Sequence, residues 1–204
     1  MRQKVLLVVV AVVLVSGGVI AVRAWQSALA RQSVIDQYVA HANQLKQTES
    51  GLSQAAVELK KALELAPECV PALLARGEVC LQLRMLKESI EHLRHAAELT
   101  EGSDHACALV WLGRALAERH RGTNDDADFR GAHNAFLEAR QDPTWEADAM
   151  QGYATLFLEK GRNQDVDKAL GVLDEFVKKY ADHADAASVR ELIEHLRHRP
   201  GAGG

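Results

Sequence analysis

The chain has 204 residues, of which 48% are apolar, 25% charged and only 5% aromatic, and its formal net charge is −4 at pH 7. This composition supports a packed core and excludes bulk disorder, and the absence of a basic stripe argues against nucleic acid as a partner. Few β-branched runs follow residue 22 and no Asn-Gly turn occurs, so we expect an all-α fold.

An apolar run dominates the N-terminus. After a short basic leader, residues 1–4, residues 5–22 carry no charge. As a helix this run would be about 27 Å long, close to the thickness of the hydrocarbon core of a bilayer. Arg23 ends it, and Trp25 follows at the depth typical of interfacial aromatic residues. We therefore predict a transmembrane signal-anchor helix over residues 5–22.

The flanking charges predict the orientation of this span. The leader has a slight excess of positive charge, which favours an N-terminus in the cytoplasm. In a bacterium, the chain would be a single-pass protein of the inner membrane with its soluble part in the periplasm. The alternative is a signal peptide cleaved after Ala30, because residues 28–30 read Ala-Leu-Ala. Ser16, Gly17 and Gly18 would allow two spans to approach closely, so self-association is possible.

Helical periodicity continues after the span. Residues 23–50 predict a helical linker or a weak first-repeat helix, and residues 51–182 contain apolar stripes at steps of three and four, interrupted by short polar breaks. The polar run His120–Asp128 predicts a long loop. Residues 183–198 predict a capping helix with one charged face, and residues 199–204 a disordered tail.

The spacing within roughly residues 36–182 resembles the tetratricopeptide repeat, a 34-residue helix-turn-helix unit. Two segments carry the small, bulky, small, proline pattern of its second helix: Ala55, Leu59, Ala62, Pro67, and Ala132, Phe136, Ala139, Pro143. Three carry the pattern of its first helix: Leu73, Gly77, Cys80; then Leu109, Leu112, Gly113, Leu116; then Met150, Tyr153, Ala154, Phe157, Gly161. Arg76 departs from the pattern where Leu is expected, and Asn43 and Lys46 depart from it in the first repeat.

This resemblance implies three or four repeats stacked into an α-solenoid behind the N-terminal span. It also implies a partner groove lined mainly by the first helix of each repeat, which would hold a protein or peptide. Carried to matching positions, the groove residues would be Leu74, Glu78, Leu81, Gln82, Val110, Arg114, Ala117, Glu118, Gln151, Thr155, Leu158 and Glu159. No cluster of Lys and Arg suggests the clamp that holds a chaperone's C-terminal carboxylate.

The sequence gives only weak indications of a catalytic or metal-binding site. The pairs His92/His95 and His195/His198 could each share a helix face, but no further ligand completes a metal site at suitable spacing. The acidic residues at 124–128 lack the order of a calcium loop, although a long loop there could contact a partner. The three cysteines fit buried apolar positions better than a disulfide framework, with a single bridge as the alternative. We expect no cofactor and no catalytic residues.

The sequence thus predicts a non-catalytic, membrane-anchored repeat scaffold that organises protein partners at a bacterial cell envelope, for example in assembly, secretion or maturation. Two alternatives remain open. One is a secreted, chaperone-like periplasmic protein with a cleaved signal peptide. The other is an enzyme or metal-binding protein built on the same helical scaffold.

Overall fold

The computed structural model describes residues 25–159 and 163–198. Within these ranges the chain is helical and contains no strand, so the predicted all-α fold is confirmed. No helix in the described ranges is long and apolar enough to cross a membrane. The predicted span over residues 5–22, the leader 1–4 and the tail 199–204 lie outside the described residues.

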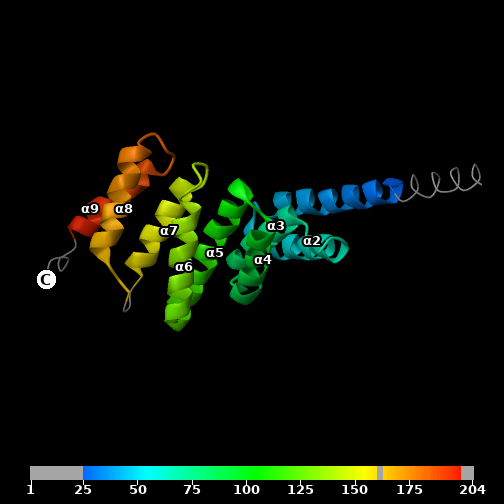
Figure 1. Cartoon of the computed structure of the whole chain (residues 1–204), viewed down its shortest axis with the longest axis horizontal. Coiled ribbons are helices and arrows are strands. Elements are labelled where there is room, and N and C mark those ends of the chain that lie inside the picture. Colours follow the sequence, from blue (N-terminus) through cyan, green and yellow to red (C-terminus); the bar gives the residue numbers. More distant parts are fainter. Residues whose placement is uncertain (1–24, 160–162, 199–204) are drawn as a thin grey trace, which may run out of the picture.

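The helices are joined by short turns and follow one another along the long axis of the molecule (Figure 1). The described part of the first helix covers residues 25–45, and the short 3-10 helix η1 (Glu49–Gly51) leads into α2. The remaining helices are α2 (Leu52–Leu65), α3 (Val70–Gln82), α4 (Leu86–Leu99), α5 (Gly102–Thr123), α6 (Asp126–Ala139), α7 (Glu146–Leu158), α8 (Val166–Lys179) and α9 (Ala186–Arg197).

Each helix packs on the next, and α5 also contacts both α3 and α7. These three helices therefore form one layer of a two-layer stack, as helix hairpins do when each buries its apolar face against its neighbours. The second-helix motif residues Ala55, Leu59, Ala62 and Ala132, Phe136, Ala139 all have 0% exposed surface. Burial explains why small and bulky side chains alternate at these positions.

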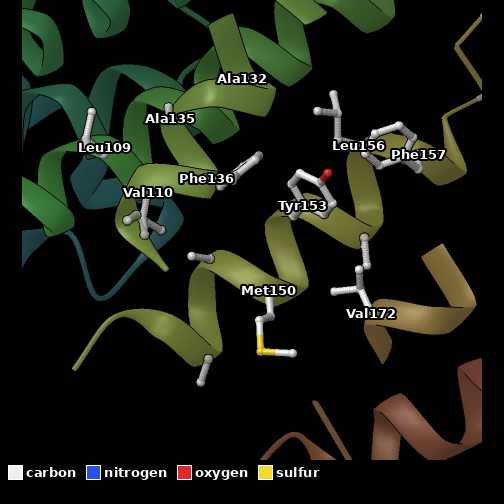
Figure 2. Packing of buried hydrophobic residues seen from close by; sticks show 14 of the residues in the cluster. Leu109, Val110, Ala132, Ala135, Phe136, Met150, Tyr153, Leu156, Phe157 and Val172 are labelled. Atoms are coloured by element: carbon white, nitrogen blue, oxygen red, sulfur yellow. The ribbon is translucent and has the colours of Figure 1, made fainter. Parts of the chain in front are cut away.

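Glycine permits the closest helix approach. Phe136 of α6 lies between Val110 of α5 and Tyr153 of α7 (Figure 2). A Cβ atom at Gly113 would stand 2.7 Å from the Phe136 ring, and one at Gly152 would stand 2.4 Å from it. Only residues without a side chain fit on both sides of this ring, so these glycines set the spacing between α5, α6 and α7.

Only the C-terminal part of the first helix packs against the other helices. Ile35 and Ala42 are buried in a cluster with residues of α2 and α3. Residues 25–34 are all exposed, and the helix extends beyond the other helices (Figure 1). Trp25 and Leu29, at 66% and 53% exposed, are large apolar side chains on this projecting part.

The predicted loop over His120–Asp128 is wrong. Residue 123 still belongs to α5 and residue 126 begins α6, so Asn124 and Asp125 alone connect them. The buried His120 ring lies 5.5 Å from that of Phe129, and its Nδ1 donates to the Asp125 carbonyl at 2.8 Å. These contacts extend α5 by a turn through a segment whose polar residues resemble a loop.

Two side chains that depart from the repeat pattern form hydrogen bonds with neighbouring helices. Arg76 replaces the expected Leu, and its guanidinium donates to the Ala56 carbonyl of α2. Lys46 follows the first helix and donates to Glu78 of α3 at 2.6 Å. Both polar side chains therefore connect neighbouring helices instead of interrupting the stack.

Candidate functional site

Side-chain pairs between successive repeats recur at the repeat length. Arg84 donates to Glu118, Arg114 to Asp148 at 2.7 Å, and Gln151 to Asp185 at 3.1 Å, and in each pair the partners are 34 residues apart. Equivalent positions of adjacent repeats lie next to each other in a stack of this period. The pairs therefore form a polar line along the layer of α3, α5 and α7.

A groove of about 440 Å³ opens on this layer. Most of the predicted partner-binding residues line it: Leu81, Gln82, Arg114, Ala117, Glu118, Gln151, Thr155 and Glu159. They come from α3, α5 and α7, with Glu159 directly after the end of α7, as a groove lined by the first helix of each repeat requires. Their role in binding a partner stays a prediction.

The other predicted groove residues lie elsewhere. Val110 is fully buried in the core, and Leu74 and Leu158 pack against the core while partly exposed. Glu78 pairs with Lys46 at 2.6 Å and accepts a longer hydrogen bond from Gln82 at 3.4 Å. The prediction for Val110 is wrong because it transferred the groove positions of one repeat to the next. That transfer ignores how far each helix is rotated toward the core.

The groove also contains residues that the sequence did not indicate: Arg84, Arg121, Phe136 and Gly152. Arg84 lies in the turn between α3 and α4 with a positive φ of 62°, so no helical periodicity could place it. Phe136 belongs to a second helix and reaches the groove between Gly113 and Gly152. The one feature of the sequence that could have indicated Arg84 is its separation of 34 residues, one repeat length, from Glu118.

Charged groups at the groove form one network. Glu118 of α5 accepts from Arg84 through one carboxylate oxygen and from Arg121 through the other, at 2.7 Å. Arg121 also holds Glu159 of α7 through two hydrogen bonds, one of them from Nε at 2.8 Å. Hydrogen bonding to Glu159 raises the pKa of Arg121, so this guanidinium stays charged. The floor between these groups is apolar: Leu81 and Ala117 form it, and the buried Phe136 ring lies beneath.

The acidic residues at 124–128 have structural roles. Asp125 caps α6 by accepting from the Ala127 amide at 2.8 Å. The buried Asp128 receives two hydrogen bonds from Arg119, at 2.7 and 2.6 Å. A long partner-contacting loop is therefore not formed here.

Among the described residues, no three His, Cys, Asp or Glu side chains come together as metal ligands would. Burial, together with Arg76, lowers the pKa of His92, while His198 pairs with Glu194 on the surface. Cys69, Cys80 and Cys107 are free, so the alternative of a single bridge is wrong. Burial raises the pKa of Cys80, and raises that of Cys107 to about 11.

Stacked antiparallel helix pairs tied together at a 34-residue period define the tetratricopeptide-repeat fold, and the resemblance seen in the sequence is confirmed at this level. A solved structure of MamA shares the fold with a TM-score of 0.55 and 22% identity, over 74% of this chain and 82% of that chain.

A second structure is described as that of YrrB, a TPR protein with an unusual peptide-binding site. It is 21% identical over 79% of this chain and 98% of its own, with a TM-score of 0.35. At that TM-score nothing about its binding site is transferred. No protein-family model matches the sequence, and no curated protein is detectably similar to it.

Proposed function

We propose that this protein is a non-catalytic scaffold whose groove on α3, α5 and α7 binds a protein or peptide partner. The observation that carries the proposal is the lining of that groove: an apolar floor between charged side chains from three consecutive repeats. A surface of this composition can hold an amphipathic segment, with apolar side chains on the floor and polar groups at the rim.

We further propose that residues 5–22 anchor the chain in the bacterial inner membrane, with the repeats in the periplasm. The apolar length of that segment supports the anchor. The described part of the first helix, residues 25–45, projects from the stack with Trp25 and Leu29 exposed. An anchor confines the groove to a surface and so raises the local concentration of membrane-associated partners.

Photo-crosslinking in native membranes tests the groove. The reversal Arg114→Glu should abolish the crosslinks that the wild-type protein forms, and Glu118→Arg should change their yield, because both residues line the groove. Arg140→Glu is the matched control, since Arg140 pairs with Glu175 of the neighbouring repeat but does not line the groove. If all three variants keep every crosslink, the groove is not the partner site.

Alkaline carbonate extraction tests the anchor, and N-terminal sequencing distinguishes it from the cleaved alternative. We expect the full-length chain to stay with the membrane pellet. A mature protein that begins after Ala30 would contradict the anchor and favour the secreted, chaperone-like protein.

A further inference from the structure

Each carboxylate that lines the groove is already paired with arginine through both of its oxygens. The Glu118 and Glu159 side chains are only 13% and 16% exposed. Glu118 uses one oxygen for Arg84 and the other for Arg121, and both oxygens of Glu159 accept from Arg121. Because both carboxylates are mostly covered and their charge is already compensated by arginine, they attract a basic partner only weakly.

Arg84 and Arg114, by contrast, keep donors that have no partner among the described residues. A guanidinium carries five N–H groups. Arg84 is 69% exposed and donates to Glu118 through Nη1 alone. Arg114 donates to Asp148, which lies just outside the groove lining, through Nη2 alone, and its guanidinium is 4.8 Å from the centre of the Trp111 ring. Stacking on the indole holds that guanidinium in place while its remaining donors stay available.

The neutral polar groups of the groove do not change this balance. The Thr155 hydroxyl donates to the Gln151 carbonyl of its own helix, and the Gln151 amide donates to Asp185. The charged groups that remain for a ligand are therefore donors, and they lie beside the apolar floor of Leu81 and Ala117.

We propose that the groove binds an acidic peptide segment. Asp or Glu side chains of the partner would pair with Arg84 and Arg114, and a neighbouring apolar side chain would lie on the floor. Charge-assisted hydrogen bonds of this kind are about twice as strong as neutral ones, which makes the partner's carboxylates the main determinant of specificity. This inference rests on the proposed function, because it names the chemistry of the partner in the same groove.

Binding of labelled peptides to the full-length chain tests the inference. The probes are fluorescein-labelled decapeptides of Leu and Ala with Asp and Glu, and matched sets in which Asn and Gln, or Lys and Arg, replace the acids. Fluorescence anisotropy measures the dissociation constants. We expect the acidic set to bind at least about tenfold more tightly than the neutral set, the effect of one charge-assisted hydrogen bond.

Two kinds of variant should change the affinity for acidic peptides in opposite directions. Arg84→Gln and Arg114→Gln should each weaken acidic-peptide binding by about tenfold, since each removes free donors. Glu118→Gln keeps the shape of the side chain but removes its charge and one accepting oxygen, which frees a donor of Arg84 or Arg121, so it should tighten binding. Arg140→Gln breaks a different pair between repeats, Arg140 with Glu175, and should leave binding unchanged. Circular dichroism confirms that each variant is folded.

Three results would overturn the inference. One is preference for the basic set, with Glu118→Gln weakening binding. Another is a lack of binding by all three sets while membrane crosslinks still depend on Arg114; the proposed function would then stand without this partner class. The third is competition by a single-stranded oligonucleotide of equal charge, with the same dependence on Arg84 and Arg114, which would replace the peptide by a nucleic acid.

Discussion

Gly152 of α7 faces the ring of Phe136 so closely that a Cβ atom at residue 152 would lie 2.4 Å from the ring carbon Cε1. Phe136 has no exposed surface, so the ring has no space into which it can move. The crossing of α6 and α7 therefore depends on a glycine in the middle of a helix, where glycine is otherwise unfavourable.

Gly152→Ala should lower the free energy of unfolding by about 1 to 3 kcal/mol, the usual cost of overpacking a core. Urea denaturation followed by circular dichroism measures this. The control is Gly171→Ala in α8, where a Cβ atom would meet nothing within 4 Å. That change should be neutral or stabilise the protein by up to about 1 kcal/mol, because alanine favours helix. Equal destabilisation by both changes would contradict the packing described here.

Ser89 attaches α4 to α3. Its buried hydroxyl donates to the Gly77 carbonyl at 2.7 Å. Ser89→Ala should cost about 1 kcal/mol of stability, the net value of one hydrogen bond. Ser53→Ala, at an exposed position of α2, should have an effect within about 0.5 kcal/mol of zero in the same denaturation assay. A loss at Ser89 no larger than at Ser53 would show that the bond contributes nothing.

Asp128 holds the end of α5 against α6 through its two hydrogen bonds from Arg119. Asp128→Asn replaces one accepting oxygen by an amide group that cannot accept, so we expect a loss of about 1 to 2 kcal/mol in the free energy of unfolding. Asp167→Asn removes the same charge from the first turn of α8, where the side chain is exposed. If the two variants lose equal stability, the helix dipole, and not the pair with Arg119, explains the effect.

His105 gives the stack a pH dependence. Its Nδ1 lies 2.9 Å from the Ala97 carbonyl oxygen and its Nε2 lies 3.1 Å from the Glu138 carboxylate, so both partners accept. Burial acts to lower the pKa of His105, but the hydrogen bonds to Glu138 and Ala97 outweigh it and the pKa is raised. The imidazolium, with two donors, is the form that satisfies both partners.

Because the folded-state pKa is raised, the stabilisation is fully present below the unfolded pKa of about 6.5 and is lost as the pH rises through the folded-state pKa. The stability difference between wild type and His105→Gln should therefore be largest near pH 5.5 and shrink toward about pH 8. His92, whose pKa is lowered, titrates in both proteins and cancels from this difference. Thermal denaturation over that range measures it, and a difference that is constant with pH would contradict the assignment.

The sequence by itself determined the repeat architecture. Ala55, Leu59 and Ala62, and again Ala132, Phe136 and Ala139, are spaced for burial on one helix face, and local periodicity of this kind depends on the chain alone. Much of the candidate groove followed from the same register, because equivalent positions in stacked repeats share a surface.

Only the tertiary structure decided the remainder. It extended α5 through His120, since contacts with Phe129 and the Asp125 carbonyl favour helix where local composition favours a loop. It also brought Arg84 from a turn and Phe136 from a second helix into the groove. Those placements depend on how neighbouring repeats rotate and approach one another, which is set by contacts between residues far apart in the chain.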